Sequence, residues 1–121
     1  MVLAVLDDLL FTSKIRSVAG HLGVPLSVAR SVDSALASMR DAPPALVLLD
    51  LTTVRIDTLG IVAAMKADVA LARIPTLGFA GHTQTELFDA ARKAGIGQVL
   101  TRGAFAERLP EIIGAVRQSP S

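Results

Sequence analysis

The sequence predicts a doubly wound α/β domain, in which helices cover both faces of a five-stranded parallel sheet. Two observations predict it: five short, almost continuous apolar runs, and the helical patterns that separate them. Apolar runs of this kind are typical of strands buried on both faces, and strands joined by helices form right-handed parallel crossovers. A length of 121 residues suits one domain, so we expect a single domain over residues 1–121.

The expected strands are short and apolar, and they cover residues 2–6, 26–29, 45–49, 76–79 and 98–101. Pro25, the pair Pro43 and Pro44, and Pro75 come shortly before the second, third and fourth of these strands. Proline cannot continue a helix, so each of these positions ends the preceding element.

Residues at helical spacing, all apolar except Lys66, follow each of the five strands. They are Ile15, Val18, Ala19 and Leu22; Ala35, Leu36 and Met39; Leu59, Val62, Ala63 and Lys66, on a helix that is apolar most of the way round; Leu87, Ala90, Ala91 and Ala94; and Leu109, Ile112, Ile113 and Val116. We expect Gly95 to end the fourth helix and Pro110 to lie in the first turn of the fifth. The polar tail over residues 118–121 resembles the start of a linker.

Composition excludes several function classes. The absence of cysteine excludes disulfides, a thiolate metal site and a cysteine nucleophile, and it fits a reducing, cytoplasmic compartment. With 12 Lys and Arg against 11 Asp and Glu and no basic run, we expect no nucleic-acid binding by this domain. The longest apolar run, residues 45–49, is far too short to span a membrane, and no basic segment precedes the first strand as in a signal peptide.

Charged residues follow three of the expected strands. Asp7 and Asp8 come after the first, Asp50 after the third and Arg102 after the fifth. In a doubly wound sheet, ligands bind beyond the carboxyl ends of the strands, and the first and third strands are usually neighbours. Three neighbouring carboxylates repel one another unless a cation intervenes, and Mg²⁺ prefers oxygen ligands of this kind. The pattern therefore predicts a site for Mg²⁺, and Arg102 could pair there with a carboxylate or a phosphate.

From residue 2 to about residue 117, the sequence resembles the receiver domains of two-component response regulators. The matching segments are Val5-Leu6-Asp7-Asp8, Leu46-Val47-Leu48-Leu49-Asp50-Leu51, Ile74-Pro75 and Ala94-Gly95. The segment at residues 5–8 is similar to the acidic pair of that family, and the segment at residues 46–51 is similar to the strand that ends in its phospho-accepting aspartate. The resemblance implies a flavodoxin-like (βα)5 fold in which Asp50 takes a phosphoryl group from a histidine kinase. It also implies that Asp7, Asp8 and Asp50 hold Mg²⁺.

By the same resemblance the domain would act in signal transduction, as part of a phosphorelay, by contacting a histidine kinase or other signalling protein. It would not be an enzyme beyond phosphorylation and dephosphorylation at Asp50. We also expect a homodimer through the fourth helix, fifth strand and fifth helix, where Leu87, Phe88 and Val99 are apolar candidates. Both signs of charge occur there, at Glu86, Asp89, Arg92, Lys93, Glu107, Arg108, Glu111 and Arg117.

Several residues depart from the family pattern. Ala80 stands where the family has a Thr or Ser, Arg102 with Gly103 stands where it has Lys and Pro, and Val99 replaces the aromatic switch residue. The loop at residues 53–58 also differs. These changes affect the groups that sense the phosphate, so the sequence resembles an atypical receiver or pseudo-receiver. Both phosphorylation at Asp50 and constitutive function remain open, and Arg102 could bind phosphate or pair permanently with Asp50.

Other interpretations also remain. The three aspartates could simply cap strand and helix ends, and His82 suits a solvated loop better than a catalytic role. A metal-dependent phosphohydrolase or a small-ligand-binding domain could use the same fold. A hydrolase with Asp50 as nucleophile would want an aspartate two residues further on, where this chain has Thr52.

Overall fold

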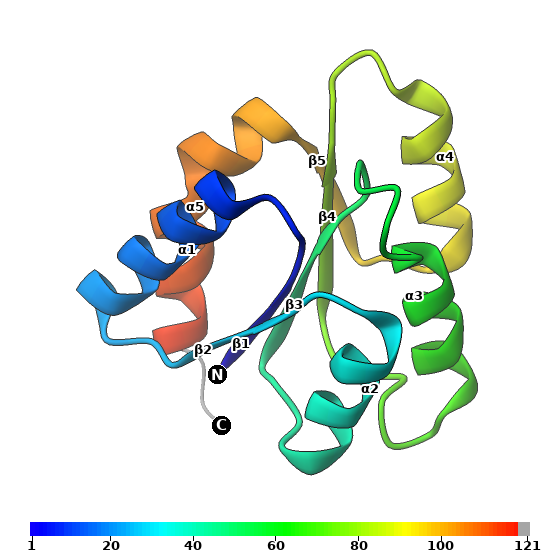
Figure 1. The fold of residues 1–121 in the computed structure, drawn as a ribbon, viewed down its shortest axis with the longest axis horizontal. Helices are drawn as coiled ribbons and strands as arrows, with labels where there is room; N and C mark the ends of the chain where they lie inside the picture. The colour runs from blue at the N-terminus through cyan, green and yellow to red at the C-terminus, as the bar shows by residue number, and fades with distance from the viewer. Residues whose placement is uncertain (119–121) are drawn as a thin grey trace.

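The computed structural model describes residues 1–118 and contains five strands that alternate with five helices (Figure 1). The elements are β1 (Val2–Val5), α1 (Leu9–Leu22), β2 (Leu26–Ala29), α2 (Val32–Asp41), β3 (Leu46–Asp50), α3 (Thr58–Ala67), β4 (Thr76–Ala80), α4 (Thr85–Ala94), β5 (Gln98–Thr101) and α5 (Arg102–Gln118). The last three residues of the tail that resembles a linker, residues 119–121, lie outside this described range.

All five strands form one parallel sheet in the order β2-β1-β3-β4-β5. Helices α1 and α5 cover one face of the sheet, and α2, α3 and α4 cover the other (Figure 1). The predicted doubly wound, flavodoxin-like fold is therefore confirmed. Each expected strand agrees with the structure to within one residue at either end, since β1 ends at Val5 and both β3 and β4 extend to the following residue.

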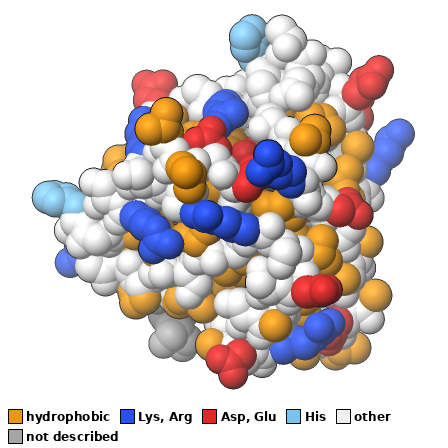
Figure 2. Space-filling model, in the orientation of Figure 1, with side chains coloured by type: hydrophobic (Ala, Val, Ile, Leu, Met, Phe, Trp, Pro, Cys, Tyr) orange, Lys and Arg blue, Asp and Glu red, His pale blue; other side chains and the backbone are white. Residues whose placement is uncertain are grey.

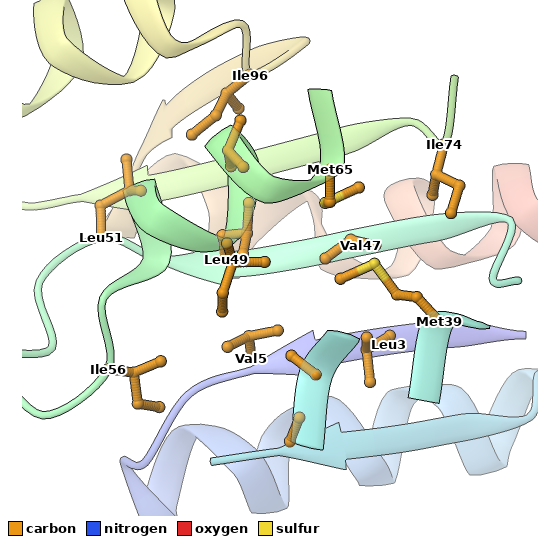
Figure 3. Packing of buried hydrophobic residues seen from close by; sticks show 14 of the residues in the cluster. Leu3, Val5, Met39, Val47, Leu49, Leu51, Ile56, Met65, Ile74 and Ile96 are labelled. Carbon is orange, nitrogen blue, oxygen red and sulfur yellow. The ribbon is translucent and has the colours of Figure 1, made fainter. Parts of the chain in front are cut away.

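Side chains alternate between two hydrophobic cores along the central strands. Leu3, Val5, Val47 and Leu49 point to the α2–α4 side, where they pack with Met39, Met65 and their neighbours (Figure 3). The intervening residues, such as Ala4 and Leu48, pack against α1 and α5. Burial on both faces explains the high mean hydropathy of +0.54 in a chain of this size.

Two helix predictions were wrong in detail. Helix α5 begins at Arg102, so Pro110 lies in its interior instead of its first turn. An interior proline removes one hydrogen bond and costs about 3 kcal/mol. The full burial of Phe105, Leu109 and Ile113 offsets that cost. The start of the helix is capped by the Thr101 hydroxyl, which accepts a hydrogen bond from the Ala104 N–H at 3.1 Å.

The second correction concerns α3. Its buried side chains are Thr58, Ile61, Val62 and Met65, whereas Ala63 and Lys66 of the expected stripe are exposed.

Gly95 does end α4, in the left-handed region at φ 98°, as predicted. No helix in the described part of the chain is long and apolar enough to cross a membrane.

Candidate functional site

The candidate site lies beyond the carboxyl ends of the strands, at the upper end of the sheet in Figure 1. The parallel register places Val5 beside Leu49, Asp50 beside Phe79, and Ala80 beside Thr101. The segments that follow β1, β3, β4 and β5 therefore meet at one edge, as the topology predicts. In the space-filling view, acidic and basic side chains lie close together in this upper region, with apolar side chains around them (Figure 2).

Asp8 is the N-cap of α1 and is bound through both oxygens. Its Oδ1 accepts a hydrogen bond from the Phe11 N–H at 3.0 Å, and its Oδ2 accepts one from Arg102 Nη2 at 2.6 Å. The Phe11 N–H, together with the Arg102 guanidinium, lowers the pKa of the Asp8 carboxyl below its ordinary value, against the opposing effect of burial. In its charged form, Asp8 therefore stabilises the start of α1 through the Phe11 N–H and the contact with α5 through Arg102.

Arg102, the first residue of α5, connects the start of α5 to the start of α1 at this edge. It forms its ion pair with Asp8, 94 residues away in sequence, and its guanidinium carbon lies 4.9 Å from the centre of the Phe11 ring. The alternative in which Arg102 pairs with Asp50 is therefore wrong in this structure. Both side chains of the ion pair are partly open to solvent, at 39% for Arg102 and 37% for Asp8.

Three phenylalanines pack under the Asp8–Arg102 pair. Phe11 meets Phe79 and Phe105 edge-on, at 5.2 and 5.6 Å between ring centres, and the last two rings stack at 4.2 Å. The cluster joins α1, β4 and α5. The sequence held a signal for it that we did not use, because these rings lie within three residues of Asp8, Ala80 and Arg102 along the chain.

Asp50 ends β3 and is almost completely buried, at 2% exposure. Its Oδ1 accepts hydrogen bonds from the Thr52 N–H at 2.9 Å and from the Thr52 hydroxyl at 2.6 Å. Among the described residues no donor binds its second oxygen, Oδ2. No buried side-chain oxygen in that range lacks a partner, so Oδ2 reaches the surface. One oxygen of Asp50 is thus held by Thr52, and the other has no hydrogen-bond partner among the described residues.

Ala80 ends β4 and is fully buried, and its methyl side chain can neither donate nor accept a hydrogen bond. The loop that follows is closed by the Gly81 N–H, which donates to the Gln84 side-chain oxygen at 2.7 Å. His82 in that loop is exposed, as the solvated-loop interpretation predicts.

Asp7 is half-buried, and its side chain makes no hydrogen bond or ion pair with the described residues. Within residues 1–118, no three side chains of the His, Cys, Asp or Glu type gather closely enough to hold a metal ion. The carboxylates have the right chemistry for Mg²⁺. As arranged, however, they do not fit the ion, because they do not gather around one point and the Arg102 cation already lies against Asp8 Oδ2.

A shallow hollow of about 440 Å³ adjoins the ion pair, between the first turns of α1 and α5. Its lining includes Asp8, Phe11 and Arg102, with Leu10 and Lys14 at the α1 side. Leu10 is 86% exposed. The sequence stripe of α1 did not include this residue, because it lies outside the apolar face that packs on the sheet.

Several solved structures have the same architecture and align with nearly the whole chain. The receiver domain of NtrX from Brucella abortus aligns at a TM-score of 0.80, covering 99% of this chain and 100% of that one, with 24% identity. The phosphorylated cyanobacterial phytochrome response regulator RcpA aligns at 0.79, with 20% identity over 97% of this chain and 90% of that one. The chemotaxis response regulator CheY4 of Vibrio cholerae aligns at 0.80, with 20% identity over 95% and 96%.

The chain has the receiver fold. A longer NtrX structure has a TM-score of 0.74 and 23% identity, covering 97% of this chain and 28% of that one, so a receiver fold can form part of a larger protein. Neither a protein-family model nor a curated protein sequence gives a significant match to this chain. The resemblance inferred from residues is therefore confirmed as a likeness of fold.

Proposed function

We propose that this chain is an atypical receiver domain in signal transduction, which acts through protein–protein contacts and accepts a phosphoryl group on Asp50. The observation that supports the proposal best is the state of Asp50. Its carboxylate ends a central strand, Thr52 fixes one of its oxygens, and its second oxygen has no partner among the described residues. A carboxylate oriented in this way is a suitable nucleophile for phosphoryl transfer.

In the proposed reaction, Asp50 Oδ2 attacks the phosphorus of a phosphohistidine on a kinase. A phosphorus–oxygen bond forms as the phosphorus–nitrogen bond breaks, and the released imidazole takes up a proton. Mg²⁺, when it is bound in receiver domains, neutralises charge on the transferred group. In this chain the positive charge present at the sheet edge belongs to Arg102, and Thr52 orients the acceptor.

The domain would transmit phosphorylation weakly along β4, because Ala80 offers no hydroxyl to the phosphoryl group. Signalling through contacts that do not depend on phosphorylation is thus part of the same proposal. Catalysis on small molecules is not, since a receiver labels itself once whereas a phosphohydrolase turns over many times.

Intact-mass measurement tests the acceptor role. The chain is incubated with acetyl phosphate, with and without Mg²⁺, beside Asp50→Asn and the control Asp57→Asn, which replaces the N-cap of α3. We expect a single phosphoryl adduct on the native chain and the control, and none on Asp50→Asn. An unlabelled native chain, or many turnovers of acetyl phosphate for each chain, would contradict the proposal.

We propose that the partner face is formed by α4, β5 and α5, with a second copy of the chain as the simplest partner. Charges of both signs suit a self-complementary interface, although Arg92 pairs with Asp89 and Arg108 with Glu111 within their own helices. The apolar part of this face consists of the half-buried side chains of Leu87, Phe88 and Val99, which leave some of their surface open. The charged residues of the face are Glu86, Asp89, Arg92, Lys93, Glu107, Arg108, Glu111 and Arg117.

Analytical ultracentrifugation tests this partner. Changing Arg92 and Arg108 together to Glu should weaken self-association, whereas the control pair Arg16→Glu and Arg73→Glu, on α1 and before β4, should not. A native chain that stays monomeric near millimolar concentration would exclude the homodimer and move the search to another protein.

A further inference from the structure

We infer that Arg102 is the built-in cation of this acidic edge, and that it competes with a divalent cation for Asp8. The inference rests on the ion pair and its surroundings and does not depend on phosphorylation of Asp50. It predicts that the chain keeps its site organised without metal, and that removing Arg102 creates the metal site that the three aspartates suggest.

The contacts of Arg102 show that its position is fixed by more than one neighbour. Its Nη2 lies 2.6 Å from Asp8 Oδ2, and its guanidinium stacks over the Phe11 ring at 4.9 Å. Phe11 in turn packs against Phe79 and Phe105, which are both fully or nearly fully buried. A guanidinium can make a charged hydrogen bond and stack on a ring at the same time, which an ammonium group does less well.

Each oxygen of Asp8 already accepts one hydrogen bond in this arrangement, and one of the two donors is a cation. The Phe11 N–H binds Oδ1 and Arg102 binds Oδ2, while Asp50 Oδ1 accepts two hydrogen bonds from Thr52. Asp7 is the member of the trio whose side chain has no hydrogen-bonding partner among the described residues. A divalent cation that used Asp8 would therefore have to displace the Arg102 guanidinium or accept a like charge a few ångströms away.

Either choice weakens metal binding. A guanidinium and a divalent ion a few ångströms apart repel each other, and the repulsion is about twice that between two unit charges at the same distance. A metal ion that displaced Arg102 would also break the link between the first turns of α1 and α5, since the Asp8–Arg102 pair joins them beside the hollow. Metal occupancy and the α1–α5 contact are thereby coupled.

The test is a Mg²⁺ titration of the full chain, followed by NMR amide shifts at residues 6–9 and 49–53. Arg102→Gln removes the charge while keeping hydrogen-bond donors on a long side chain. The control Arg73→Gln makes the same charge change in the loop before β4, at the opposite end of the sheet. We expect Arg102→Gln to bind Mg²⁺ about tenfold more tightly than the native chain, and Arg73→Gln to bind like the native chain.

The double variant Asp8→Asn with Arg102→Gln should lose that gain, which shows that Asp8 is the contested ligand. Equal affinity of the native and Arg102→Gln chains would overturn the inference. If Arg102→Gln does not fold, the native chain decides the matter through the side-chain N–H signals of Arg102. Those signals should change with the same Mg²⁺ midpoint as the amides of residues 7 and 8, and metal binding that leaves them unchanged would overturn the inference.

Discussion

The ends of β1 and β3 place aspartates at the same edge of the sheet, yet their surroundings differ. Asp8, three residues beyond β1, is 37% exposed and is bound by a helix N–H and by an arginine from the far end of the sequence. Asp50, the last residue of β3, is 2% exposed, and among the described residues its carboxylate is bound only by Thr52, two residues away. The more exposed carboxylate thus has the long-range partners.

We propose that this difference separates a structural carboxylate, Asp8, from a chemically reactive one, Asp50. Asp8 caps α1 and anchors α5, so its loss should disturb the fold. Asp50 keeps one oxygen outside the hydrogen-bond network of the described residues, so its loss should disturb the chemistry and leave the fold nearly intact. The effects of substituting Asp8 and Asp50 on stability and on phosphorylation can therefore be compared directly.

The largest effect on stability should come from the Phe11 ring, which lies under the Asp8–Arg102 ion pair. Phe11→Ala removes two edge-on aromatic contacts and the surface on which Arg102 stacks. We expect a loss of about 3 kcal/mol in the free energy of unfolding, measured by urea denaturation. Phe88→Ala is the control, because Phe88 is only half-buried and meets Arg92 at 5.9 Å; its loss should be clearly smaller. Equal losses would mean that the cluster has no special role.

The two aspartates come next. Asp8→Ala removes an N-cap, typically worth about 1 kcal/mol, and a partly exposed ion pair worth about 0–1 kcal/mol, so the free energy of unfolding should fall by about 1–2 kcal/mol. Asp50→Asn keeps an oxygen that can accept both Thr52 hydrogen bonds, and we expect a change below about 1 kcal/mol. The same denaturation experiment checks both. A larger loss for Asp50→Asn than for Asp8→Ala would reverse the assignment of roles.

Strand positions and the acidic edge could be predicted from the sequence, because buried parallel strands are continuous apolar runs and Asp50 ends one of them. The start of α5 could not, because Gly103 and Ala104 add no apolar stripe and Pro110 suits a first-turn position. The partner of Arg102 could not be predicted either. Its choice of Asp8 over Asp50 depends on side-chain direction and on the Phe11 ring, which strand order alone does not determine.

A smaller effect should appear on acidification. Asp8 has a lowered pKa in the folded chain, so its charge stabilises the fold fully above the unfolded value of about 3.9. That contribution is lost as the pH falls through the folded pKa. Asp8→Asn keeps an N-cap without the charge. The native chain should therefore be the more stable at neutral pH, and the difference in urea midpoint should shrink as the pH drops below about 4. A difference that stays constant or grows would contradict this account of Asp8.

The smallest response should be at β4. Phosphorylation of Asp50 should change the hydrogen exchange of residues 80–105 only slightly, because Ala80 provides no hydroxyl. Ala80→Thr should enlarge the change in hydrogen exchange that a phosphodonor causes. Ala80→Val should not, because valine has the shape of threonine but lacks its hydroxyl. A large native response that neither variant alters would show that β4 transmits the signal by another route.

Chemical mapping of the phosphorylated residue tests the division between the two aspartates most directly. Borohydride reduces an aspartyl phosphate to homoserine, and peptide mass spectrometry after treatment with a phosphodonor then locates the converted residue. We predict homoserine at position 50 and none at positions 7, 8 or 57. Conversion at position 8, or at any of these positions in place of 50, would contradict the assignment of Asp50 as the chemical carboxylate and Asp8 as the structural one.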